Sequence, residues 1–182
     1  MQTYIAFLRG INVSGVKKIK MADLRAMMND LGFKDVETYI QSGNIIFNSD
    51  HENVQYVSEI IKKEILDVFG FDVPVLVKTK ADIAGVIEKC PYKKKEDLEA
   101  KRIYYVLLKD VPKEENMASL KQENYPNELF TITKTCVYLN CIKGAGKAKL
   151  TNNIIERKLK VEATTRNHRT MSKLLTMSNE ES

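Results

Sequence analysis

A glycine-rich loop with lysines lies between a predicted strand and a predicted helix, at residues 141–150 (CIKGAGKAKL). A loop of this kind can bind a phosphate, because the first amides of a helix point at the anion and a lysine adds charge. The phosphate-loop pattern of nucleotide hydrolases is not met, since Cys141 replaces its first glycine and Ala148 replaces its magnesium-binding hydroxyl residue. The sequence predicts either a looser anion site, using Lys147, Lys149 and the glycine backbone, or a plain connecting loop.

Two arginines, Arg166 and Arg169, flank Asn167, the predicted N-cap of a C-terminal helix. Cations at a helix N-terminus oppose the macrodipole and cost about 0.3–1 kcal/mol per exposed charge. A bound phosphate or carboxylate would turn this penalty into attraction, so we treat these residues as candidate ligands of an anion. Lys20 stands in the same position before a helix predicted to begin at Met21, although an exposed, salt-screened lysine is also tolerated there.

Further hydrogen-bond donors follow the predicted strands of the first half of the chain. Arginine forks bind oxyanions in a bidentate manner, and amides complete such a site without adding charge. Two alternatives stay open, because serine and asparagine are also usual in hairpin turns and an asparagine can cap a loop. The candidate ligand-binding residues in this half are Arg9, Asn12, Gln41, Ser42 and Asn44.

Signatures of common enzymes are absent from the sequence. His51 and His168 are the two histidines, and neither lies near a serine or cysteine in a recognisable nucleophile motif. No histidines or carboxylates have the spacing of metal ligands, so the sequence predicts no metal and no cofactor. The three cysteines are too few for a disulfide framework and are expected to be buried thiols.

The positive charge is concentrated in the second half of the chain. The net charge is +5, and residues 134–173 contain ten basic residues against Glu156 and Glu162. A surface with this charge favours an anionic partner, such as nucleic acid or a phosphorylated small molecule. The alternative is that many of these charges only solvate the exposed faces of two helices.

The composition is that of a soluble globular protein of one domain or two small ones, with 43% apolar and 29% charged residues. No run approaches the roughly 18 apolar residues of a membrane span, and charge follows the N-terminus too soon for a signal peptide. We therefore expect a cytoplasmic protein that does not associate with membranes.

The hydrophobic pattern of residues 1–79 predicts the element order βαββαβ. Strands are expected at residues 4–9, 36–40, 44–47 and 73–78, with helices from Met21 to Gly32 and over residues 52–69. This is the split βαβ arrangement of ferredoxin-like folds, in which two helices cover one face of a sheet.

The pattern begins again after a mixed-charge connection that contains a short helix, at residues 80–101. A strand is expected at residues 103–108, then a helix, a hairpin over residues 129–142, a helix to Leu159 and a C-terminal helix over residues 167–177. The sequence therefore predicts an α+β protein of two related subdomains, residues 1–79 and 102–182, possessing antiparallel or mixed sheets. The second copy is expected to lack the last strand.

Four segments together resemble the bacterial family known as domain of unknown function 1697, from the first strand to the C-terminal helix. The resemblance implies a two-part α+β fold with ferredoxin-like elements, a cytoplasmic bacterial protein and no established activity. The family usually has tryptophan where this chain has His168. The segments are LRGINV (8–13), MADLR (21–25), TYIQSGNIIF (38–47) and ATTRNHRT (163–170).

Three hypotheses on function remain. The first is a module that binds a phosphate-bearing ligand or nucleic acid. The second is an enzyme that holds an anionic small molecule with Arg9, Arg166 and Arg169 and acts by electrostatic stabilisation. In the third, the same residues serve a structural or partner-binding role between the two halves. The sequence carries no signal for the oligomeric state.

Overall fold

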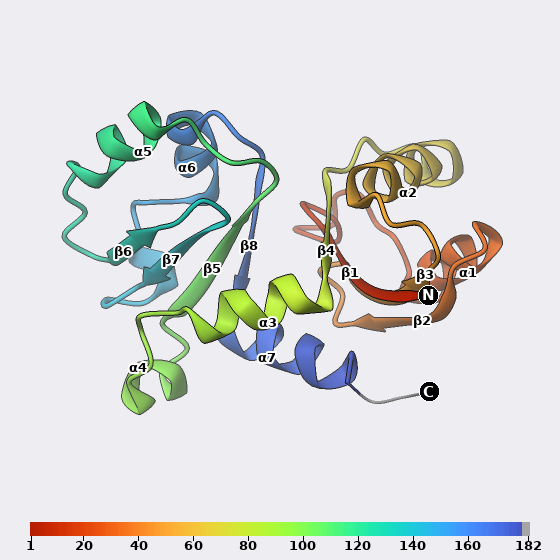
Figure 1. Cartoon of the computed structure of the whole chain (residues 1–182), viewed down its shortest axis with the longest axis horizontal. Helices are drawn as coiled ribbons and strands as arrows, with labels where there is room; N and C mark the ends of the chain where they lie inside the picture. The colour runs from red at the N-terminus through yellow and green to blue at the C-terminus, as the bar shows by residue number, and fades with distance from the viewer. Residues whose placement is uncertain (180–182) are drawn as a thin grey trace. The chain divides into compact units, whose positions relative to one another are not determined.

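The computed structural model describes residues 1–179, and the chain divides into two compact units. Within the described residues, the first unit contains residues 1–84 and 174–179, and the second contains residues 85–173. Each unit has a four-stranded antiparallel sheet with helices between its strands (Figure 1). The predicted α+β class with two related subdomains is thereby confirmed.

The first unit has the predicted βαββαβ order, and its sheet has the strand order β2-β3-β1-β4. All neighbouring strands of this sheet are antiparallel. Its elements are β1 (Gln2–Leu8), α1 (Met21–Asp30), β2 (Lys34–Tyr39), β3 (Asn44–Ser49), α2 (Val54–Phe69) and β4 (Val75–Thr79), and α3 (Lys80–Glu88) follows.

Capping residues set the limits of α2. The Asn53 side chain accepts hydrogen bonds from the backbone N–H groups of Gln55 (3.0 Å) and Tyr56 (3.1 Å), as an N-cap residue does. At the other end, Gly70 adopts a left-handed conformation with φ +73°, which a residue without Cβ reaches at little cost. The sequence predicted this end of the helix.

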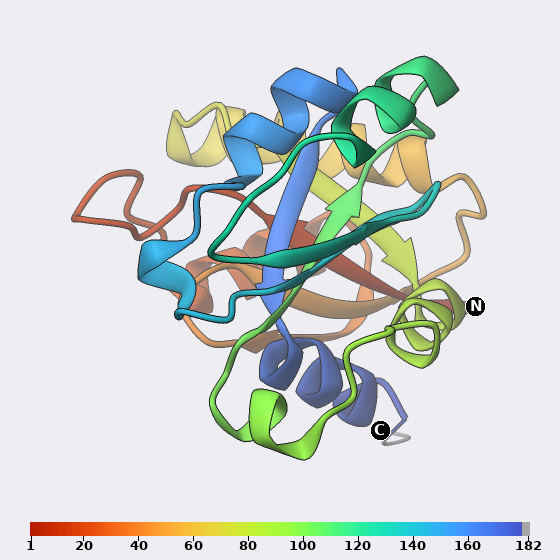
Figure 2. The ribbon, with the colours of Figure 1, turned by 90° about the vertical axis from the view of Figure 1, so that its left-hand side faces the viewer.

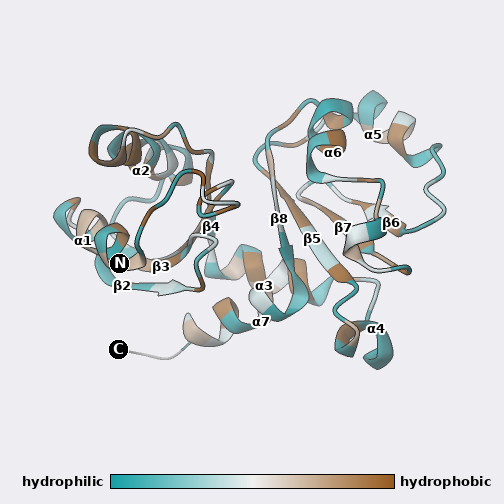
Figure 3. Cartoon of the chain, turned by 180° about the vertical axis from the view of Figure 1, so that it is seen from behind, coloured by the Kyte–Doolittle hydropathy of each residue, from teal (hydrophilic) through white to brown (hydrophobic). Residues whose placement is uncertain are grey.

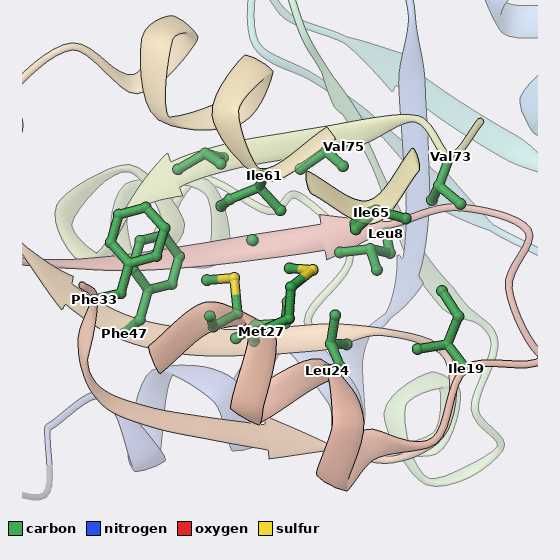
Figure 4. Packing of buried hydrophobic residues seen from close by; sticks show 14 of the residues in the cluster. Leu8, Ile19, Leu24, Met27, Phe33, Phe47, Ile61, Ile65, Val73 and Val75 are labelled. Carbon is green, nitrogen blue, oxygen red and sulfur yellow. The ribbon is translucent and has the colours of Figure 1, made fainter. Parts of the chain in front are cut away.

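Both helices α1 and α2 pack on one face of the sheet (Figure 4). Leu24 and Met27 of α1 and Ile61 of α2 meet the side chains of Leu8 and Phe47 from the strands. Side chains on both faces of β1 are fully buried, as the continuous apolar run of this strand predicts.

The second unit has the sheet order β6-β7-β5-β8, again with antiparallel neighbours (Figure 2). The helices α5 and α6 pack on one face of it, and α6 carries both hydrophobic and hydrophilic residues, as an amphipathic helix should (Figure 3). The elements are α4 (Lys95–Glu99), β5 (Ile103–Leu108), α5 (Glu114–Lys121), β6 (Leu129–Ile132), β7 (Cys136–Asn140), the 3-10 turn η1 (Ala145–Lys147), α6 (Asn152–Leu159) and β8 (Ala163–Asn167). The last helix, α7 (His168–Met177), begins in this unit, and its residues from Leu174 belong to the first unit.

The two units repeat the same pattern at the level of single hydrogen bonds. The amide of Leu8 donates to the carbonyl of Gly43 (2.8 Å), and the amide of Leu108 donates to the carbonyl of Thr135 (3.0 Å). One residue later, the backbone amide of Arg9 donates to the carbonyl of Pro74 (3.1 Å), and the backbone amide of Lys109 donates to the carbonyl of Glu162 (2.9 Å). The two units therefore share the same backbone pattern at this point, and Lys109 occupies the place of Arg9.

The expectation that the second copy lacks its last strand is wrong. Residues 163–167 form β8, which pairs with β5 along its whole length as β4 pairs with β1. Ala163 is the one apolar residue of this strand, whose sequence is ATTRN. The alternation of apolar and polar residues that indicates a half-buried strand is therefore missing.

No helix within residues 1–179 is long and apolar enough to cross a membrane.

Candidate functional site

Asn12 uses its whole side-chain amide to hold the loop between β1 and α1. Its Nδ2 atom donates to the carbonyls of Ile19 (2.9 Å) and Gln41 (2.8 Å), and its Oδ1 atom accepts from the amide of Ile19 (2.9 Å). The residue also has φ +55°, a conformation that asparagine tolerates better than most residues. The side chain is therefore committed to joining the loop to the β2–β3 turn.

Two further predicted donors serve the same turn. Asn44 is fully buried, and its Nδ2 atom donates to the carbonyl of Tyr39 (2.9 Å) and to Oγ of Ser42 (3.0 Å). The structure thus brings Asn12, Gln41, Ser42 and Asn44 together, but the asparagine amides face internal acceptors. These contacts favour a structural role for both asparagines.

The remaining candidates of the first unit are more accessible. Lys20 is exposed at the N-cap of α1 and makes no side-chain cap, and the Gln41 side chain is also exposed. Arg9 is half-buried directly after β1. Lys20, Gln41 and Arg9 therefore remain the candidates of this unit for contact with a ligand.

In the second unit, the backbone of the glycine-rich loop is already engaged. The amides of Gly144, Lys147 and Ala148 donate to loop carbonyls. The amides of Lys149 and Leu150 donate to Oε1 of Glu128, the first of these at 2.7 Å. An internal carboxylate thus occupies part of the predicted anion cradle, and Lys147 and Lys149 keep only their exposed side chains for a ligand.

Glu128 is the residue of this site that sequence reasoning missed. It lies 21 residues before Lys149, just ahead of β6, and it is 3% exposed. A lone glutamate in a loop gives no local signal of such a contact. Its carboxylate fixes the loop, so the loop lysines are presented from an ordered backbone.

The Arg166–Arg169 segment divides between two elements. Asn167 caps α7, because its Oδ1 atom accepts from the amide of Thr170 (2.8 Å), as the sequence predicts. Arg166 instead belongs to β8, where it pairs with Tyr105 and donates from Nη1 to the carbonyl of Thr165 (2.9 Å). Burial lowers the pKa of the Arg166 guanidinium to about 10, so it stays charged at neutral pH. Arg169 is exposed on the first turn of α7.

His168 stacks on a buried tyrosine. Its ring lies 5.9 Å from the ring of Tyr105 with 26° between the planes, and Nδ1 is 2.8 Å from the Tyr105 hydroxyl. The other nitrogen, Nε2, lies 3.2 Å from Oγ of Ser172. A smaller ring therefore makes a stacking contact at this position, and burial lowers the pKa of the imidazole.

We expect the lowered pKa of His168 to make the protein less stable in mild acid. Near pH 6.5 the unfolded chain takes up a proton on His168 more readily than the folded protein does. The contribution of the neutral imidazole to the free energy of unfolding is therefore present above pH 6.5 and is lost as pH falls below it. Urea unfolding at pH 7 and pH 5 should give a larger loss of unfolding free energy for the wild type than for His168→Gln. Equal losses would contradict this assignment.

Comparison with known proteins supplies the family. Residues 1–138 match a family described as "Protein of unknown function (DUF1697)". The chain belongs to the DUF1697 family. The match ends within β7, so the glycine-rich loop and residues 163–170 lie outside it. No curated protein matches the sequence significantly.

A solved structure shares the fold of this DUF1697 protein. It is described as "conserved bacterial protein SP0830 from Streptococcus pneumoniae", with a TM-score of 0.75 and 24% sequence identity. The similarity covers 97% of this chain and 98% of the other. At this identity the likeness concerns the fold alone.

No group of three or more histidine, cysteine or acidic residues within residues 1–179 is arranged to hold a metal ion. The three cysteines are buried free thiols.

Proposed function

We propose that the second unit binds a phosphate-bearing ligand, either a small molecule or a nucleic-acid strand, through exposed basic side chains of residues 134–173. Eight of the ten basic residues of this segment are exposed, and no ion pair within residues 1–179 engages them. They are Lys134, Lys143, Lys147, Lys149, Arg157, Lys160, Arg169 and Lys173.

The single observation that carries the proposal is that the two acids of the segment are engaged elsewhere. Glu156 accepts a hydrogen bond from the amide of Ala163 (2.7 Å), and Glu162 pairs with Lys109 (3.2 Å). The one paired lysine of the segment, Lys158, contacts Glu123. The exposed cations therefore make no ion pair within residues 1–179, and an excess of exposed positive charge attracts polyanions.

The proposed interaction is electrostatic and largely independent of base sequence. Tyr138 is the one aromatic residue of the segment, and it is 1% exposed with its hydroxyl bonded to the carbonyl of Val86 (2.9 Å). It cannot stack on a base from this position, whereas sequence-tolerant binders of single strands usually offer such a ring. Phosphate contacts from lysine side chains would then supply most of the affinity.

A thermal-shift panel tests this proposal. Nucleotides, sugar phosphates and short RNA and DNA strands are added at low and high salt, with the unphosphorylated nucleoside and sugar as controls. We expect the phosphate-bearing compounds alone to raise the melting temperature, and the rise to shrink at high salt, because a ligand that binds the folded state stabilises it. Equal shifts with the unphosphorylated controls, or no shift with any compound, would contradict the proposal.

A further inference from the structure

A hollow of about 550 Å³ lies beside β6 within the second unit. Its volume is that of a small-molecule site. The residues around it come from the end of α5, from the chain between α5 and β6, from β6 itself and from the segment after α3. Those that carry the inference are Tyr92, Lys121, Glu123, Tyr125, Glu128 and Phe130.

Glu128 lines this hollow and carries a buried carboxylate oxygen without a hydrogen-bond partner in the described chain. Its Oε1 atom accepts the amides of Lys149 and Leu150, whereas Oε2 is buried and has no hydrogen-bond partner within residues 1–179. Protonation would not satisfy this atom, because an O–H group there would also need an acceptor. A buried polar atom without a partner requires an explanation, and a bound donor provides one.

A second buried acceptor without a partner lies close by. Oδ1 of Asn140 has no hydrogen-bond partner within the described residues, and Asn140 lines a smaller hollow of about 300 Å³. Tyr92 and Leu129 line both hollows. Because both unsatisfied atoms are acceptors, the chemistry of this region calls for a guest that donates hydrogen bonds.

Aromatic rings form the walls of the larger hollow. The rings of Tyr125 and Phe130 are 5.8 Å apart and meet at 82°, and Tyr92 contributes a third ring. Burial, with the neighbouring Glu123 and Glu128 carboxylates, raises the pKa of Tyr125 to about 12, so this ring stays neutral. Neutral aromatic faces attract a cation, most strongly when the cation is shielded from water.

The charges around the hollow leave one carboxylate to be neutralised. Glu123 is already paired with Lys158 and accepts a hydrogen bond from the Tyr125 hydroxyl (2.6 Å). Lys121 is exposed and lines the hollow, where its charge opposes a cation. Of the two acids that line the hollow, Glu128 is the one without an ion-pair partner within residues 1–179.

We propose that this hollow binds a small alkylammonium compound, with the ammonium group at Glu128 and the alkyl chain against the rings of Tyr92, Tyr125 and Phe130. The hollow adjoins the basic segment of the proposed function through Glu128 and Glu123, but it takes ligands of the opposite charge. Binding of an anion by the exposed lysines does not require the hollow to be filled.

Isothermal titration with 1,4-diaminobutane tests this site, with 1,4-butanediol as a neutral control of similar shape. We expect the wild type to bind the diamine and not the diol. Glu128→Gln keeps an Oε1 acceptor for the amides of Lys149 and Leu150 but replaces the unsatisfied oxygen with a donor. We expect this change to weaken diamine binding at least tenfold, whereas Glu115→Gln, at an exposed site on α5, should leave it unchanged.

A second variant keeps the test decisive if Glu128→Gln unfolds. Phe130→Leu retains an apolar side chain but removes an aromatic wall, so we expect diamine affinity to fall severalfold. The proposal is overturned if the diamine does not bind, if the diol binds equally well, or if folded Glu128→Gln binds the diamine as the wild type does. Unchanged affinity in Phe130→Leu would also overturn it.

Discussion

Gly43→Ala should lower the free energy of unfolding by about 3 kcal/mol. Gly43 has φ +77°, where an alanine costs about 1–2 kcal/mol. An added Cβ would also lie 2.7 Å from Cβ of Leu8 and 2.8 Å from Cδ1 of Ile11. Leu8 cannot move aside, because its Cβ is fixed to β1 and its amide is bonded to Gly43 itself. Overpacking of this kind adds about 1–3 kcal/mol.

Gly32→Ala is the matched control for this prediction. Gly32 also has a positive φ, +88°, but an added Cβ would meet no atom within 4 Å. In urea unfolding at pH 7, the loss of unfolding free energy in Gly32→Ala should therefore reflect only the cost of a positive φ for alanine. If Gly43→Ala is no more destabilising than Gly32→Ala, the predicted overpacking against Leu8 and Ile11 does not contribute to the free energy of unfolding.

Replacing the three loop lysines with glutamine should weaken oligonucleotide binding about 100-fold at 0.1 M salt. The variant is Lys143→Gln/Lys147→Gln/Lys149→Gln, and all three side chains are exposed on the loop that Glu128 holds. For a single strand, each lost phosphate contact changes the affinity about 5-fold at this salt concentration, so three contacts give roughly 100-fold. Fluorescence polarisation with a labelled single strand measures the change.

The control variant removes the same charge from another exposed lysine run of the second unit. Lys93, Lys94 and Lys95 precede and begin α4, and Lys95 pairs with Glu99 (3.7 Å). Substitution of these three residues by glutamine should weaken binding far less. Equal weakening by both triple variants would mean that net charge alone, and not the loop, determines affinity.

The sequence predicts an element well where its own residues determine it. The buried run of β1, the Asn167 cap of α7 and the glycine end of α2 all depend on neighbours a few residues away. These predictions are confirmed because local propensity and packing agree there. The polar strand β8 was missed because its partner, β5, lies about sixty residues earlier and supplies the burial that the sequence of β8 does not suggest.

The candidate site shows the same division. Residue types suggested that asparagine and lysine side chains and loop amides would meet an anion. In the structure, Asn12 meets the turn at Gln41, and the amides of Lys149 and Leu150 meet Glu128. Both contacts join segments more than twenty residues apart, and nothing in a local motif determines them.

The salt dependence of oligonucleotide binding tests the central claim most directly. Dissociation constants for the wild type and the loop-lysine variant are measured by polarisation from 0.05 to 0.2 M salt. We expect the logarithm of the wild-type binding constant to fall steeply with the logarithm of salt concentration, with the slope of the variant shallower by about 2, since each phosphate contact contributes about 0.7. A wild-type affinity that does not change with salt, or identical slopes for both proteins, would contradict an anion-binding role for this segment.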